Sequence, residues 1–200
     1  MQQRSIFARS ETGRISRNAL LPYLLFFFAV GFGGWLWEVL VYWVQHSGEY
    51  SLPELLGVYR GVLHGLWAPI YGVGAVWMVL LRAATKQGPL RYFLTCAGVC
   101  AGVEYLTSWG LEAMFHARWW DYTGCFLNLN GRICAMSILF FAAAGMAVAY
   151  GVAPCFWRLV RRAPQPGAAG VCISLTLLFL LDLLRSLVSP NLGVGVLPLA

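Results

Sequence analysis

Five long apolar stretches constrain the fold of this chain more than any other feature of its sequence. They cover residues 20–44, 66–84, 90–115, 132–157 and 170–189, and a helix needs about 20 apolar residues to cross a bilayer. Only 11% of the 200 residues are charged, against roughly a quarter in soluble domains. Backbone groups in lipid must be satisfied within the protein, and runs of this length do so as helices. The sequence therefore predicts an all-α, polytopic membrane protein with five transmembrane helices.

The basic residues predict how these helices are oriented. Of the 14 Lys and Arg residues, 10 precede the first stretch or lie in or beside the second and fourth connections, which share one side if five helices alternate. The positive-inside rule places that side, and the N-terminus, in the cytoplasm. Topology thus explains the net charge of +6, and we expect no nucleic-acid partner. We expect a basic cytoplasmic tail over 1–18, one membrane domain over 19–190 and an external tail over 191–200.

The connection between the first two stretches carries helix signals of its own. Ser51 is followed three residues later by Glu54, which is typical of a capping box, and Pro53 fits a first helical turn. We expect a short external helix over 52–66, either interfacial or re-entrant. Pro69 then has two interpretations: it breaks the backbone at membrane depth, which is tolerated where the backbone is buried in protein, or it begins the second span after an ordinary loop.

The third stretch shows the clearest polar pattern. Cys96, Cys100, Glu104, Ser108 and Glu112 recur every four residues and so lie on one face of a helix. The two glutamates are about 12 Å apart along the helix axis, at a rise of 1.5 Å per residue. Charges in lipid cost several kcal/mol each, so this face indicates a site rather than ordinary packing.

Polar and aromatic residues of the next connection complete the candidate site. We expect a polar cavity that opens outward, walled by the first, third and fourth helices and covered by the two external segments. Its carboxylates and arginines are expected to pair, because an unpaired buried charge is costly. The predicted substrate-binding residues are Glu38, Arg60, His64, Glu104, Ser108, Glu112, Trp120, Asp121, Tyr122, Asn130 and Arg132. In the fifth stretch, Asp182 and Arg185 are spaced for an intrahelical ion pair.

The cysteine pattern predicts neither a metal site nor a cofactor. The six cysteines are scattered and form no C-x-x-C pair. Cys96 and Cys100 are typical of small apolar residues inside a helix bundle. Cys125 and Cys134 fall on the predicted outer side, where a disulfide between them is an open alternative.

Four patterns resemble the CmpB-type family, labelled putative ABC transporter permease, type IV. They are Trp35–Glu38, RG-x-x-x-G-x-x-x-PIYG (Arg60–Gly72), EY-x-TSW-x-LE (Glu104–Glu112) and WWDY…N-x-NGRI (Trp119–Ile133). The resemblance covers residues 20–157 and leaves the fifth stretch outside. It implies a small polytopic protein of the bacterial plasma membrane. Its marker positions here are Glu38, Arg60, Glu104, Glu112, Trp120, Asp121, Asn130 and Arg132.

Three functions remain open at this point. The favoured one is a permease-like transport component that binds a small polar solute or cation, with Glu104 and Glu112 at the centre. The second is an intramembrane enzyme acting on a lipid head group, with the same glutamates as catalytic acid and base and arginines that hold phosphate. The third is a non-catalytic membrane scaffold.

The predicted partners follow from the favoured function. The lipid bilayer surrounds the chain, and a second copy of the chain is a candidate partner. No G-x-x-x-x-G-K-[ST] loop occurs in the sequence, so an ATPase that drives transport is expected to be a separate subunit.

Overall fold

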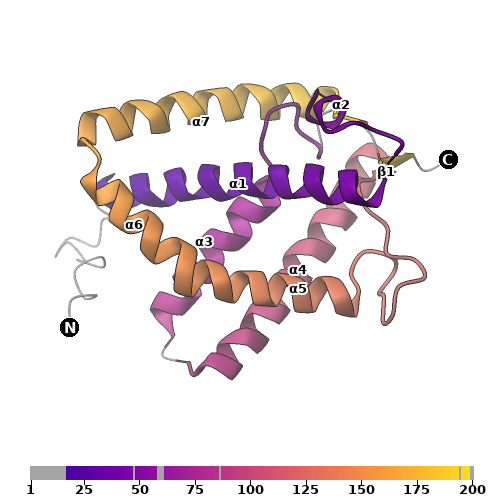
Figure 1. Ribbon diagram of the computed structural model, residues 1–200, viewed down its shortest axis with the longest axis horizontal. Helices are drawn as coiled ribbons and strands as arrows, with labels where there is room; N and C mark the ends of the chain where they lie inside the picture. Colours follow the sequence, from indigo (N-terminus) through magenta and orange to yellow (C-terminus); the bar gives the residue numbers. More distant parts are fainter. Residues whose placement is uncertain (1–16, 47, 58–60, 86, 194, 199–200) are drawn as a thin grey trace.

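The protein is a bundle of long helices with one small sheet (Figure 1). The computed structural model describes residues 17–46, 48–57, 61–85, 87–193 and 195–198. In chain order, the elements are α1 (Arg17–Gln45), α2 (Leu52–Gly57), α3 (Pro69–Ala84), α4 (Pro89–Phe115), β1 (Ala117–Arg118), α5 (Ala135–Ala147), the π-helical turn η1 (Val148–Val152), α6 (Ala153–Arg162), α7 (Gln165–Val188) and β2 (Leu197–Pro198). β1 and β2 pair antiparallel.

The helices confirm the predicted class, an all-α polytopic membrane protein. Three of them are long and apolar enough to cross a bilayer: Leu20–Gln45, the continuous Ala135–Arg162 helix formed by α5, η1 and α6, and α7. α3 is apolar but has 16 residues. α4 has 27 residues, but charged and hydroxyl side chains interrupt its apolar surface. The count of five spans stays a prediction, as does their orientation.

Prolines mark where several helices begin. Pro69 and Pro89 stand in the first turns of α3 and α4, and Pro166 stands in the first turn of α7. A proline there removes no internal hydrogen bond, because the first N–H groups of a helix have no partner within the helix. α4 ends at Phe115, and its C-cap His116, whose backbone is left-handed (φ 52°), turns the chain into the connection that precedes α5.

The helix between α1 and α3 is shorter than the sequence predicts. The capping box is present: the Ser51 N–H donates to Glu54 Oε2 at 2.7 Å, and the Glu54 N–H donates to Ser51 Oγ at 3.4 Å. α2 nevertheless ends at Gly57, and residues 61–66 are not helical. Gly61 has a φ of 97°, which a right-handed helix does not allow. The expectation of a helix over 52–66 was therefore wrong for residues 61–66, while residues 58–60 lie outside the described residues.

Asp182 of α7 holds this non-helical segment in place. Its Oδ1 accepts from the His64 N–H at 3.0 Å, and its Oδ2 accepts from the Gly65 N–H and the Trp67 indole, each at 2.7 Å. The predicted ion pair with Arg185 is absent from the described ion pairs. The carboxylate instead satisfies backbone donors that would otherwise lie unpaired among apolar side chains.

The two interpretations of Pro69 both describe part of the structure. Pro69 begins α3, as expected if it starts the second span. The residues before it form irregular backbone that is packed in protein, as expected if Pro69 breaks the backbone. Leu63 and Ala68 are buried, and the Ala68 N–H donates to the carbonyl of Gly31 in α1 at 2.9 Å. This segment therefore belongs to the bundle rather than to a surface loop.

Close packing of α1 against α3 brings the first site residues together. A Cβ at Gly34 would collide with the ring of Tyr71, so the glycine lets the two helices approach. Tyr71 consequently reaches Glu38 on α1, one turn further along. α4 packs against α5, and α7 lies against α1.

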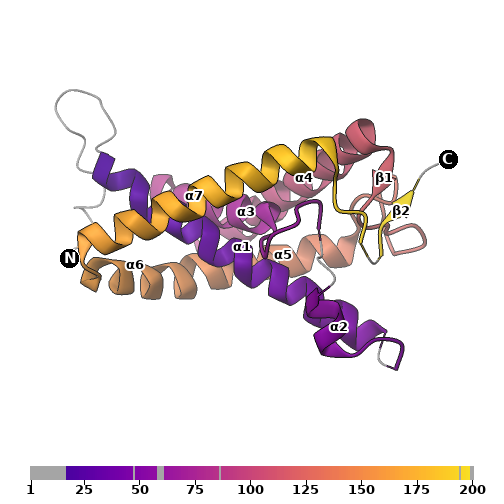
Figure 2. The same cartoon turned by 90° about the horizontal axis from the view of Figure 1, so that it is seen from above.

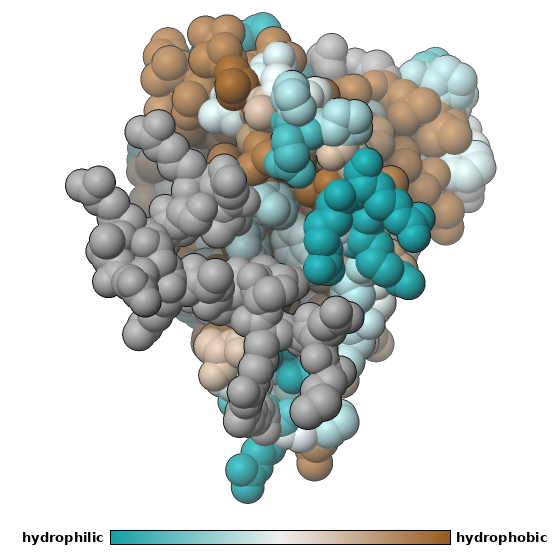
Figure 3. All heavy atoms as spheres, turned by 90° about the vertical axis from the view of Figure 1, so that its left-hand side faces the viewer, coloured by the Kyte–Doolittle hydropathy of each residue, from teal (hydrophilic) through white to brown (hydrophobic). Residues whose placement is uncertain are grey.

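The two ends of the bundle differ in character. α2, β1 and β2 lie at one end, and the junction of α6 with α7 lies at the other (Figures 1 and 2). Figure 3 views the junction end, where hydrophilic side chains gather between hydrophobic flanks. Arg158, Arg161 and Arg162 of α6 are exposed. In the predicted topology this basic end faces the cytoplasm.

Candidate functional site

A cavity of about 280 Å³ lies among the helices. Its walls come from α1, α3, α4, α5 and η1, together with residues from 61–68 and 119–122. The sequence predicted the first, third and fourth of the apolar stretches as walls but did not include α3. Most lining residues are apolar, in contrast to the predicted polar cavity. Among the described lining residues, Glu38 and Glu104 alone carry a charged group.

Glu104, at the middle of the predicted polar face of α4, is held by two hydroxyl groups. It is 5% exposed. Its Oε1 accepts from Tyr122 Oη at 2.9 Å, and its Oε2 accepts from Ser137 Oγ at 3.1 Å. Burial and the nearby Glu104 carboxylate raise the pKa of Tyr122, so its phenol stays protonated and donates. No Lys, Arg or His of the described chain forms an ion pair with Glu104.

The start of α5 explains where Ser137 lies. Cys134 is the N-cap: the Ser137 N–H donates to Cys134 Sγ at 3.4 Å, and the Cys134 N–H donates to Ser137 Oγ at 3.1 Å. This reciprocal capping fixes the serine side chain. Its hydroxyl lies 3.1 Å from Glu104 Oε2 and 3.0 Å from the Cys134 carbonyl oxygen, so these two acceptors share its one proton. Cys134 and Cys125 are both free thiols, so the alternative of a disulfide between them is not realised.

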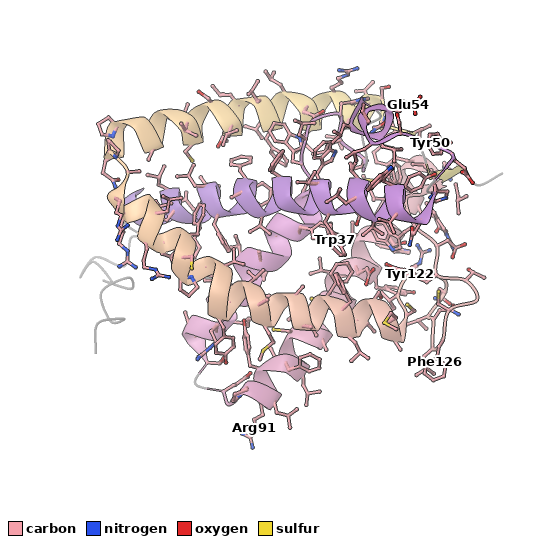
Figure 4. The ribbon with its side chains drawn as sticks, in the orientation of Figure 1. Trp37, Tyr50, Glu54, Arg91, Tyr122 and Phe126 are labelled. Atoms are coloured by element: carbon pink, nitrogen blue, oxygen red, sulfur yellow. The ribbon has the colours of Figure 1, made fainter. Side chains whose placement is uncertain are left out.

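Glu38 provides the second carboxylate of the cavity. It accepts a hydrogen bond from Tyr71 Oη of α3. Each cavity carboxylate is thus bonded to a tyrosine from another segment: Glu38 to Tyr71, and Glu104 to Tyr122 of the connection after α4. In Figure 4, Tyr122 lies among side chains between α1 and α5, whereas Phe126 of the same connection extends away from the bundle.

A second group of charges forms what we term the arginine cluster, which consists of Glu112, Arg118, Asp121 and Arg132. Glu112 Oε2 pairs with Arg118 Nε at 2.6 Å and with Arg132 Nη1 at 2.9 Å. Arg132 Nη1 also donates to Ser108 Oγ at 3.2 Å. The hydrogen bond to Glu112 raises the pKa of Arg118. The cluster joins the last turns of α4 to the connection that follows it.

That connection folds tightly around Asp121. Thr123 donates to Asp121 Oδ1 from its hydroxyl at 2.6 Å and from its N–H at 2.9 Å. These bonds, with a smaller contribution from Arg118, lower the pKa of Asp121. Gly131 has a φ of 67°, and a Cβ there would collide with the Asp121 carboxylate. A glycine is therefore required at this position, which lies within the NGRI pattern.

The structure divides the predicted site residues into separate groups. Glu38, Glu104, Trp120 and Tyr122 line the cavity. Five other predicted site residues belong to the arginine cluster or form hydrogen bonds with its arginines: Ser108, Glu112, Asp121, Asn130 and Arg132.

The remaining two predicted residues do not join either group. The side chain of His64 does not line the cavity, and its Nε2 is 2.9 Å from the carbonyl oxygen of Ser189. The helix that was expected to orient His64 is not formed at that point. Arg60 lies outside the described residues.

Sequence reasoning missed several residues of the cavity. Tyr71 and Ser137, which bond the two carboxylates, were not among the candidates. Trp119 and Thr107 also line the cavity. Tyr71 stands within the PIYG pattern, and Ser137 stands three residues after Cys134, which is the spacing of a capping box. The PIYG pattern could have pointed to Tyr71, whereas Cys-x-x-Ser is not the usual capping-box sequence, so Ser137 had no clear signal.

Comparison with known proteins places the chain in a family. No curated protein and no solved structure matches it. The model of the CmpB-type family, described as "Putative ABC-transporter type IV", matches residues 25–187. This match includes nearly all of α7, so the expectation that the fifth apolar stretch lies outside the family pattern was wrong. The chain belongs to this family and is a membrane protein of the ABC-transporter type.

Proposed function

We propose that the chain is the membrane-spanning, permease-like component of a transporter in the bacterial plasma membrane. Its cavity is an outward-facing binding site for a small solute. The observation that carries this proposal is the environment of Glu104, which is buried, lines the cavity and accepts from neutral hydroxyls. An ionised carboxylate in such surroundings is costly without a cationic partner, and a bound solute or a proton supplies one.

The contrast with Glu112 argues against a purely structural role for Glu104. A charge that holds a bundle together needs a partner within the protein, and Glu112 has two, Arg118 and Arg132. Glu104 forms no ion pair with a basic side chain of the described residues. The same contrast disfavours a phosphate-binding enzyme, because these two arginines pair with Glu112 and do not line the cavity.

We further propose that a separate ATPase subunit supplies the energy for transport. The family is of the ABC-transporter type, and the sequence contains no G-x-x-x-x-G-K-[ST] loop. ATP hydrolysis therefore requires another chain. In the predicted topology this subunit binds on the side of the basic residues.

Blocking the cavity tests the proposal. Ala144 of α5 lines the cavity, whereas the adjacent Ala143 is exposed on the surface of the same helix. We expect Ala144→Trp to fill the cavity and Ala143→Trp to leave it open. Cells that lack the chain are complemented with each variant and given a defined mixture of sugars, amino acids and organic amines. Mass spectrometry then measures depletion of each solute from the medium.

The expected result is a solute whose uptake requires the wild-type chain. Ala143→Trp should retain that uptake, and Ala144→Trp should reduce it to the level of cells without the chain. Equal amounts of each variant in the membrane are required for the comparison. Uptake that is unchanged by Ala144→Trp, at equal protein levels, would show that solutes do not use this cavity.

A further inference from the structure

We infer that the solute of this cavity is an organic ammonium ion with an apolar body, held through its positive charge at Glu104. This inference rests on the proposed function of the same cavity and names the chemical class of its substrate. It draws on three properties of the described lining residues: the sign of their charges, the lack of a metal-binding group among them, and the apolar and aromatic character of the remaining wall.

The sign of the lining charges selects cations. Both charged side chains among the described lining residues, Glu38 and Glu104, are carboxylates. Glu104 receives hydrogen bonds from Tyr122 and Ser137, which stabilise it without cancelling its charge. A negative cavity raises the local concentration of cations and repels anions. A zwitterion such as an amino acid would bring its own carboxylate beside that of Glu104, with no described basic side chain in the lining to receive it.

The lining does not suit a metal cation. Within the described chain, no three His, Cys, Asp or Glu side chains are grouped so that they would hold a metal ion. Calcium takes 6–8 oxygen ligands, and magnesium needs a near-octahedral set. A substituted ammonium ion has no such requirement, because its charge is spread over alkyl groups.

The rest of the wall suits the apolar part of an organic cation. Tyr71, Trp119, Trp120, Tyr122 and Phe141 contribute aromatic side chains, and Met78 is among the aliphatic residues. Aromatic faces attract alkylated ammonium groups by cation–π interaction. A sugar would lose hydrogen bonds to water and find few replacements on this wall, at a cost for each unpaired hydroxyl. The volume of about 280 Å³ is near the lower end of the range for small-molecule pockets, which begins at roughly 300 Å³.

A charged ligand and its neutral isostere provide the test. Choline and 3,3-dimethylbutan-1-ol have nearly the same shape and differ in the positive charge, and tetraethylammonium serves as a larger cation. Binding to the full-length chain in detergent micelles is measured by calorimetry and by tryptophan fluorescence, since Trp119 and Trp120 line the cavity. We expect choline or tetraethylammonium to bind at least about ten-fold more tightly than the neutral alcohol. A ten-fold difference in Kd corresponds to about 1.4 kcal/mol of binding free energy.

Two variants locate the source of this preference. Glu104→Gln should remove it by weakening the binding of the cations while leaving the affinity for the neutral alcohol unchanged. Glu49→Gln makes the same change at an exposed site outside the cavity and should retain the full preference.

Several results would overturn the inference. They are failure of both cations to bind, equal affinity for the neutral alcohol, and a preference that persists in Glu104→Gln. These outcomes differ from a failure of the proposed function. If Ala144→Trp blocks the uptake of a sugar or an anion, the transport function stands and the ammonium assignment falls. If Ala144→Trp blocks no uptake, both fall.

Discussion

Replacing Glu104 with glutamine is expected to abolish solute uptake while the chain still folds. Glutamine has nearly the same shape, and its carbonyl oxygen can still accept a hydrogen bond from Tyr122 or Ser137. The change therefore removes the charge and preserves the packing. Removing one partner of a buried charge pair typically costs 2–5 kcal/mol of binding, so the affinity for a cationic solute should fall by at least about 30-fold. Uptake per molecule of protein in the membrane measures the loss.

Thermal unfolding of the purified variant separates this functional loss from a loss of folding. Glu49→Gln, an equal change of charge at an exposed site, should retain both stability and uptake. Wild-type uptake by Glu104→Gln would show that its charge has no part in transport. Loss of the variant from the membrane, together with a lower unfolding temperature, would instead support the scaffold hypothesis.

Replacing Glu112 with glutamine should have the opposite profile, a large loss of stability. Glu112 is the shared partner of Arg118 and Arg132, and the side chain of Arg132 is only 9% exposed. Breaking a fully buried pair costs 3–5 kcal/mol. Because the Glu112 side chain is 23% exposed, we expect water to reduce this cost to about 2 kcal/mol. Denaturant-induced unfolding in detergent micelles measures the difference.

The variant Glu112→Gln also tests the division of the site into two groups. At a temperature where it is folded, its uptake should remain near that of the wild type, because Glu112 does not line the cavity. Unchanged stability combined with a complete loss of uptake would mean that the arginine cluster binds solute directly.

The helices and the polar face of α4 could be predicted because both depend on local pattern. A long apolar run and a four-residue spacing determine a helix and one of its faces wherever the chain folds. Glu104 and Glu112 were identified in this way. Their different roles could not be predicted, because the partners of Glu112 come from the connection that folds back onto α4.

The other differences between the sequence predictions and the structure arise from partners that are distant in the chain. Residues 61–66 are not helical, and the carboxylate that satisfies part of their backbone comes from Asp182, more than 110 positions later in the chain. The i,i+3 spacing of Asp182 and Arg185 indicated a local ion pair, which is the better arrangement for an exposed helix. In the bundle, unpaired N–H donors compete for the same carboxylate and displace the local pair.

Labelling of single cysteines is the most direct test of a solute cavity that opens to the outside. Cys100 lines the cavity, Cys125 is exposed in the connection after α4, and Cys155 is exposed on α6 near the basic end. Three variants each keep one of these cysteines and replace the other five with serine. Intact cells are treated with a membrane-impermeant thiol reagent, with and without choline or tetraethylammonium.

We expect the reagent to modify Cys100 and Cys125 in intact cells, and Cys155 only after the membrane has been opened. We also expect the organic cations to slow the modification of Cys100 and to leave that of Cys125 unchanged. Modification of Cys100 only after the membrane has been opened, at a rate that the cations do not affect, would contradict an outward-facing solute cavity.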